Sequence, residues 1–117
     1  MKYLFLCAVG INRSPTAARI AYVIAKERGL DVQTFYGGID SLLNAHDKTA
    51  FMQGKDPKAH FEQYDRIFVM EKYMKDGLEK TIGVEPQKIV CLHIPDEYLR
   101  DDMELVKILR NNLGIFI

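Results

Sequence analysis

Four short strand-like runs, separated by stretches of helical periodicity, constrain the fold of this 117-residue chain more than any other feature. The runs occupy residues 2–7, 31–36, 66–70 and 88–92. Strands that alternate with helices form parallel sheets through right-handed crossovers. The sequence therefore predicts an α/β fold with a four-stranded parallel sheet and helices on both of its faces. The chain is long enough for one hydrophobic core, so we expect residues 1–117 to form a single domain.

The stretches between and after these runs predict helices of unequal length. The expected helices cover residues 15–28, 47–53, 56–63, 72–82 and 102–113. Ala17, Ile20, Ala21 and Ile24 share one face of the first helix, and Leu105, Val106, Leu109 and Leu113 share one face of the last. Gly37 and Gly38 are expected to turn the chain after the second strand. Residues 39–56 carry the weakest pattern, and only the short helix at 47–53 is predicted there.

The stretch from Cys7 to Pro15 contains the residues most suited to chemistry. A thiol follows the first strand, and Arg13, Ser14 and Pro15 come after five further residues. We expect Ser14 to cap the first helix and Pro15 to occupy its first position. A loop at this place lies at the carboxyl end of a buried strand, where open α/β sheets bind their ligands.

The chemistry of this loop indicates a phosphate site. The first N–H groups of a helix lack internal partners, and together with the helix dipole they favour a dianion. Gly10 permits the positive φ angle that a curled, anion-binding loop requires. Arg13 adds a planar charged fork that matches two phosphate oxygens. Cys7 lies in the same positive field, which favours its nucleophilic thiolate form.

These residues resemble those of the low-molecular-weight protein tyrosine phosphatases, and the likeness is to a short prokaryotic branch of that family. The Cys-x5-Arg-Ser-Pro pattern that begins at Cys7 is one match. Residues 94–98, Ile-Pro-Asp-Glu-Tyr, resemble the loop that carries the family's general acid, and residues 64–71 resemble its third strand. The resemblance implies a sheet with the strand order 2-1-3-4. That order places the loops after strands one and four at the same end of the sheet.

The resemblance also implies a role for each site residue. Cys7 would be the nucleophile that forms a phosphocysteine, Arg13 would hold the phosphate oxygens, and Asp96 would be the general acid. Ser14 would donate a hydrogen bond to the sulfur, and Tyr98 would form a wall for an aromatic substrate ring. The remaining substrate-binding residues would be Ala8, Val9, Gly10, Ile11 and Asn12. No metal or cofactor is expected, because Arg13 and the loop amides replace a cation.

The sequence departs from the family pattern at several positions. Longer members usually carry Asn where this chain has Gly10, and often a second Cys where it has Asn12. The Pro that follows the general acid is replaced by Glu97, whose charge acts on Asp96 and on acidic substrates. Residues 39–56 lack a match to the family's variable substrate-recognition loop. These departures leave the rate and the substrate open.

Simpler interpretations compete for individual residues. Cys7 is also explained as a buried core residue, Asp96 as a turn residue, and Tyr98 as surface packing. Asp101 and Asp102 compete with Asp96 for the acid role. Outside the site, Cys91 is expected in the core, Lys72, Lys75 and Lys80 on a solvated helix face, and His46, His60 and His93 in structural or surface positions without metal-ligand spacing.

The composition restricts the partners of the chain. Sixteen basic and sixteen acidic residues give no net charge, which argues against nucleic acid and anionic membranes as partners. Two cysteines do not form a disulfide scaffold, so a reducing, cytoplasmic location is expected. The apolar run after Met1 is too short for a secretory signal. We expect a monomer or weak homodimer that acts on a phosphorylated protein or a small aryl phosphate.

Three functions remain at this stage. The first is a phosphomonoester hydrolase of the tyrosine-phosphatase type, with phosphotyrosine as the default substrate. A small aryl phosphate and protein phosphoarginine, which carries a P–N bond in place of the ester, are the alternative substrates. The second is an arsenate reductase, which would need an external thiol because Cys91 is the only other cysteine. The third is a phosphate-binding regulatory module with weak catalysis, suggested by Gly10 and Glu97.

Overall fold

The computed structural model describes all residues from Met1 to Ile117 and contains a four-stranded sheet. The strands are β1 (Lys2–Cys7), β2 (Gln33–Gly38), β3 (Arg66–Val69) and β4 (Ile89–Cys91). Their order is β2-β1-β3-β4, and every neighbouring pair is parallel. The predicted sheet and its order 2-1-3-4 are therefore confirmed, and the ends of β1, β3 and β4 lie at one edge.

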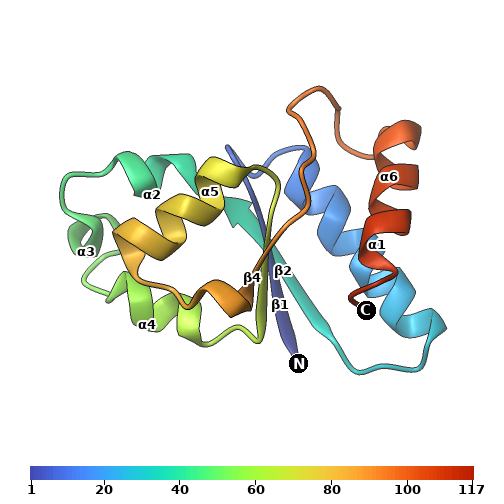
Figure 1. Cartoon of the computed structure of the whole chain (residues 1–117), viewed down its shortest axis with the longest axis horizontal. Coiled ribbons are helices and arrows are strands. Elements are labelled where there is room, and N and C mark those ends of the chain that lie inside the picture. The colour runs from blue at the N-terminus through green and yellow to red at the C-terminus, as the bar shows by residue number, and fades with distance from the viewer.

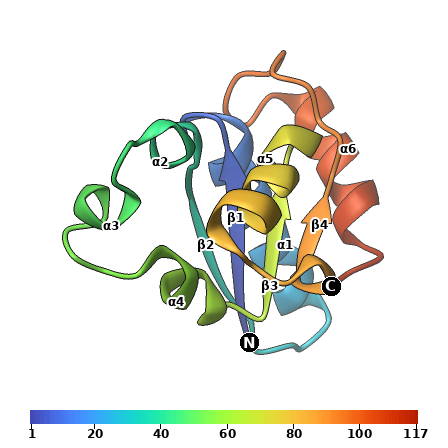
Figure 2. The ribbon, with the colours of Figure 1, turned by 60° about the vertical axis from the view of Figure 1, so that its left-hand side comes forward.

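Helices cover both faces of this sheet, as Figures 1 and 2 show. The long helices α1 (Arg13–Glu27) and α6 (Met103–Leu113) lie together on one face. The other face carries α5 (Lys72–Gly77) and a layer of short helices. These are α2 (Asp40–Asn44), α3 (Lys48–Phe51) and α4 (Pro57–Glu62). None of the helices has the length and apolar character needed to cross a bilayer.

The core is built from the apolar faces that the sequence pattern predicts. The rings of Phe5 and Phe68 stack with their centroids 4.8 Å apart, and Phe116, beyond α6, packs edge-on against Phe68. The four predicted inward residues of α1 are all buried. In α6, Leu105, Leu109 and Leu113 are buried, whereas Val106 is half-buried and not fully inward as expected.

The start of α1 differs from the prediction. The helix begins at Arg13 with Asn12 as its cap residue, so Pro15 is its third residue and Ser14 is not the cap. The Ser14 hydroxyl instead donates to the Gly37 carbonyl, 3.2 Å away, and is therefore not available to the helix end. Pro15 is tolerated because the N–H group at its position has no partner within a helix.

The other boundaries differ by smaller amounts. β2 runs from Gln33 to Gly38, because Gly37 and Gly38 pair with Leu6 and Cys7 and do not turn the chain as predicted. Helix α2 was not predicted. The predicted helix 72–82 is divided into α5 and a π-helical segment, Leu78–Ile82. α3 and α4 lie within their predicted ranges, capped by Asp47 and Asp56.

Candidate active site

The loop between β1 and α1 is folded around the sulfur of Cys7. Cys7 is the last residue of β1 and is buried. The Gly10 N–H donates to Cys7 Sγ at 3.1 Å, and Ser14 Oγ lies 3.1 Å from the same sulfur. The Ser14 hydroxyl thus bridges the thiol and the Gly37 carbonyl of β2. A thiolate at this position would be held by an amide and within reach of a hydroxyl.

A cavity of about 120 Å³ opens in front of this sulfur. It is lined by Cys7, Ala8, Val9, Ile11, Asn12, Arg13 and Asp96. All seven were predicted as site residues from the sequence. Gly10 and Ser14 contact the sulfur but do not line the cavity, and the half-buried Tyr98 ring packs against the core. The fold therefore brings the nucleophile, arginine and acid candidates together, and leaves Tyr98 outside this cavity.

Arg13 is held by the segments that follow β3 and β4. Its side chain is only 1% exposed, and its Nη1 donates to Glu71 Oε2 at 2.8 Å and to the Ile94 carbonyl at 2.7 Å. Its Nε lies 3.7 Å from Asp96 Oδ1. A buried guanidinium requires such partners, because burial of an unpaired charge is very costly. The arrangement fixes one edge of the fork and leaves Nε and Nη2 as the donors for an incoming anion.

Glu71 is a site residue that the sequence analysis missed. It directly follows β3, at the same edge of the sheet as Cys7 and the segment after β4. Its carboxylate reaches Arg13 although the two residues are 58 positions apart. An acidic residue at the exit of a strand next to β1 was the available signal, because the carboxyl ends of parallel strands meet at one edge.

The loop is also fixed by close contact with the end of β2. Gly10 has a φ angle of +82°, as the curled loop requires. A Cβ atom at Gly10 would lie 2.6 Å from the Gly38 nitrogen, and one at Gly38 would lie 2.5 Å from Val9. Backbone bonds join the same parts, with Ile39 N donating to Cys7 O at 3.0 Å and Asp40 N to Ala8 O at 3.2 Å. The absence of a side chain at Gly10 and at Gly38 therefore allows the loop to pack directly against the backbone of β2.

No part of the chain gathers the side chains of a metal site. No group of three His, Cys, Asp or Glu residues lies close enough to hold an ion. Cys91 is in β4, which β3 separates from β1, and it does not line the cavity. A second thiol is therefore not positioned to react with Cys7.

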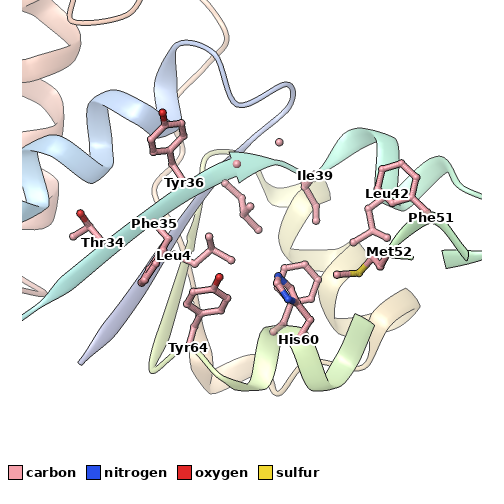
Figure 3. A pocket seen from close by; sticks show the side chains of 14 residues that line it. Leu4, Thr34, Phe35, Tyr36, Ile39, Leu42, Phe51, Met52, His60 and Tyr64 are labelled. Atoms are coloured by element: carbon pink, nitrogen blue, oxygen red, sulfur yellow. The ribbon is translucent and has the colours of Figure 1, made fainter. Parts of the chain in front are cut away.

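A larger, apolar pocket of about 450 Å³ lies between β2 and α2–α4 (Figure 3). Its lining includes Phe35, Phe51, His60 and Tyr64. Gly37, whose carbonyl accepts from Ser14, also lines it. Burial, followed by the charge of Lys55, lowers the pKa of His60 below its ordinary value. None of the candidate catalytic side chains faces this pocket.

Comparison with known proteins finds solved structures of the same fold, but no family model or curated protein of similar sequence. No protein-family model matches the chain, and no curated protein does so either. Among solved structures, a low molecular weight protein tyrosine phosphatase from Bacillus subtilis matches with a TM-score of 0.65 and 19% identity, over 98% of both chains. The chain has the fold of the low molecular weight protein tyrosine phosphatases. The fold expected from the Cys-x5-Arg-Ser-Pro resemblance is thus confirmed.

Two further structures of this phosphatase fold carry ligands or modifications. Vibrio vulnificus Wzb in complex with benzylphosphonate has a TM-score of 0.66 and 22% identity, over 98% of this chain and 95% of that one. A mutant of YwlE, described as an arginine phosphatase and found in Bacillus subtilis, has a phosphorylated active-site serine. It has a TM-score of 0.66 and 18% identity, over 99% and 95% of the two chains.

Proposed function

We propose that this protein is a phosphomonoester hydrolase of the protein tyrosine phosphatase type, acting through a phosphocysteine on phosphotyrosine or a similar aryl phosphate. One observation carries the proposal: Cys7, Arg13 and Asp96 line the same cavity. A nucleophile, a fixed cation and an acid around one space of about 120 Å³ match the needs of phosphoryl transfer. The phosphatases that share the fold support the same conclusion.

In the first step, Cys7 Sγ attacks phosphorus and the bond from phosphorus to the leaving oxygen breaks. Asp96 gives its proton to that oxygen, so the alcohol leaves neutral. Arg13 Nε and Nη2, with the N–H groups of the loop, hold the other phosphate oxygens in the transition state. As phosphate enters, the guanidinium exchanges its 3.7 Å contact with Asp96 Oδ1 for the anion.

In the second step, water attacks phosphorus and the bond between phosphorus and sulfur breaks. Asp96 takes a proton from this water, and Cys7 leaves as a thiolate. Ser14 Oγ, 3.1 Å from the sulfur, turns its proton from Gly37 toward the thiolate and stabilises it as the leaving group. Inorganic phosphate then departs and the site is restored.

The rim of the cavity supports an aryl substrate. Val9 and Ile11 line the cavity and are 70% and 60% exposed, so two apolar side chains stand beside its mouth. An aromatic ring attached to the bound phosphate would cover them and remove apolar surface from water. The benzylphosphonate complex of Wzb has such a ring next to a phosphonate.

The first experiment measures hydrolysis of phenyl phosphate against pH for wild type, Cys7→Ser and Asp96→Asn. We expect a bell-shaped profile for wild type and no turnover by Cys7→Ser, which still binds phosphate. Asp96→Asn should lose the alkaline limb and about 10²-fold or more in rate, the usual size of a general-acid effect. If the wild type binds phosphate but does not hydrolyse phenyl phosphate, the phosphatase proposal is refuted and a phosphate-binding module is favoured.

A second measurement separates the substrates. A phosphotyrosine peptide and a phosphoarginine peptide of the same sequence are compared by kcat/KM, and arsenate reduction is assayed with and without added thiol. We expect the phosphotyrosine peptide to be preferred. Preference for the phosphoarginine peptide would contradict the proposed aryl substrate and favour phosphoarginine, in keeping with the name of YwlE as an arginine phosphatase. Thiol-dependent reduction of arsenate would refute the phosphatase and favour an arsenate reductase.

A further inference from the structure

The segment that carries Asp96 crosses the N-terminal end of α1 on its way from β4 to α6 (Figure 1). We call residues 95–102 the acid segment. Asp96 itself makes only a 3.7 Å ion pair with Arg13 and is 66% exposed. Its position over the cavity therefore depends on how the rest of the acid segment is attached.

Two backbone N–H groups attach the acid segment to α1 and its cap. The Arg100 N–H donates to Asn12 Oδ1 at 3.0 Å, and the Asp101 N–H donates to Thr16 Oγ1 at 2.9 Å. The Thr16 hydroxyl donates in turn to the Asn12 carbonyl at 2.8 Å. The Thr16 hydroxyl thus joins the acid segment to the loop between β1 and α1. It accepts from Asp101 in the acid segment and donates to Asn12 at the end of the loop.

These contacts hold a conformation that the acid segment would not adopt by itself. Asp101 has a φ angle of +62°, which is unfavourable for a residue with a side chain. Its carboxylate also pairs with Arg19, 3.0 Å from Nη2, and the Arg100 guanidinium lies 5.9 Å from the centre of the Tyr36 ring. Both of these side-chain contacts are exposed and weak. The bond to Thr16, whose side chain is fully buried, is partly shielded from water, whereas the bond to Asn12 is exposed, so the bond to Thr16 is the stronger attachment.

We propose that Thr16, together with Asn12, is a positioning residue that holds Asp96 over the cavity. The inference rests on the proposed phosphatase function. Asn12 occupies the place where the resembling phosphatases often carry a cysteine, which is a poor hydrogen-bond acceptor. In this chain the side chain at that place accepts from the acid segment, and Thr16 completes the attachment.

Loosening the acid segment should affect leaving groups unequally. A general acid contributes most when the leaving oxygen is basic and little when it departs readily as an anion. A variant with a displaced Asp96 should therefore lose more activity on phenyl phosphate than on 4-nitrophenyl phosphate. A general disturbance of the site would lower both rates alike.

The test compares Thr16→Val with Thr16→Ser. Valine has the shape of threonine but cannot accept from the Asp101 N–H, whereas serine keeps the hydroxyl. We expect Thr16→Val to lose about 10-fold in kcat/KM on phenyl phosphate and about 2-fold on 4-nitrophenyl phosphate, a part of the full general-acid effect. The comparison uses kcat/KM because this parameter reports the step in which the leaving group departs, whereas hydrolysis of the phosphocysteine is common to both substrates. Thr16→Ser should remain close to wild type on both substrates, and Asn12→Ala should repeat the unequal loss.

Amide hydrogen exchange of a peptide spanning the acid segment gives a readout independent of turnover. We expect faster exchange there in Thr16→Val than in wild type or Thr16→Ser. Equal exchange in all three proteins would refute the attachment itself. Faster exchange with equal losses on the two substrates would refute the positioning role. Inactive wild type would refute the proposed function and, with it, a role for Thr16 in catalysis.

Discussion

At the scale of single residues, Gly10 shows how this chain builds the loop between β1 and α1 without the Asn that the resembling enzymes usually carry there. Its φ angle of +82° satisfies the curl of the loop, and its missing side chain lets the loop touch Gly38. Ile39 and Asp40 then hold the loop through backbone bonds to Cys7 and Ala8. Close backbone contact thus fixes the loop without a side chain at position 10.

Introducing the Asn of the resembling enzymes at position 10 should therefore be harmful. In Gly10→Asn, the new Cβ would lie 2.6 Å from the Gly38 nitrogen, and the loop would have to move. We expect urea unfolding to show a loss of about 2 kcal/mol or more, in the range of overpacked sites. Phosphate affinity should fall as well.

Gly29→Asn is the matched control for this substitution. Gly29 also has a positive φ angle, +68°, but nothing lies within 4 Å of a Cβ placed there. Asn tolerates this backbone region, so the cost should stay below about 1 kcal/mol. Equal costs at the two glycines would show that backbone conformation, and not contact with β2, limits the residue at position 10.

Residue by residue, the sequence predicted which candidate side chains gather at the site better than it predicted their supports. Cys7 and Arg13 were predicted from their types and spacing, and Asp96 was predicted from the resemblance. All three line the same cavity. Glu71 and Thr16 were missed because their roles depend on contacts with residues 58 and 85 positions away. Such contacts form only once the sheet is assembled, and the only signal in the sequence was the position of Glu71 directly after β3.

At the scale of elements, α4 couples stability to pH. His60 lies on α4 against Phe61 and Tyr64, beside the apolar pocket in Figure 3. Burial lowers its pKa below the ordinary value of 6.5, and Lys55 adds to the effect. The folded chain therefore favours neutral His60, while the unfolded chain takes up the proton below pH 6.5.

We accordingly expect stability to be complete above about pH 6.5 and to fall as the pH decreases through the window below it. Urea unfolding at about pH 7.5 and pH 5.5 should show a smaller decrease for His60→Gln than for wild type. The exposed His46 supplies a control, and His46→Gln should retain the decrease of wild type. A decrease in His60→Gln as large as in wild type would assign the effect to other groups.

Element boundaries were predicted where local signals act alone. The caps Asp47 and Asp56 accept bonds from the first turns of α3 and α4, as their sequences indicate. The start of α1 and the end of β2 were misplaced because tertiary contacts decide them. Ser14 bonds to Gly37 and not to its own helix, and Gly38 continues the strand because Cys7 pairs with it.

At the scale of the whole molecule, the strand order makes the site possible. Parallel strands in the order β2-β1-β3-β4 bring the exits of β1, β3 and β4 to one edge. Arg13 is consequently fixed by Glu71 after β3 and by Ile94 after β4. The sequence predicted the shared edge from the resemblance, but not which groups would neutralise the buried guanidinium.

This placement makes the stability of the molecule depend on Glu71. Glu71→Ala would remove the carboxylate that accepts from Arg13 Nη1 and leave the guanidinium, 1% exposed, with the Ile94 carbonyl and the 3.7 Å contact with Asp96. We expect a loss of about 2 kcal/mol in urea unfolding without phosphate, because removing one member of a buried charged bond leaves the other unsatisfied. Glu71→Gln keeps an acceptor and should lose less.

Glu27→Ala provides the comparison at the far end of α1. It also removes a carboxylate from an arginine, but Glu27 and Arg110 are 52% and 46% exposed, so the loss should stay below about 1 kcal/mol. Saturating phosphate should recover part of the stability of Glu71→Ala, because the dianion binds the unpaired guanidinium only in the folded state. It should give no additional stabilisation to Glu27→Ala beyond that of wild type. Equal losses in the two variants would mean that water reaches Arg13 and that Glu71 does not support the site.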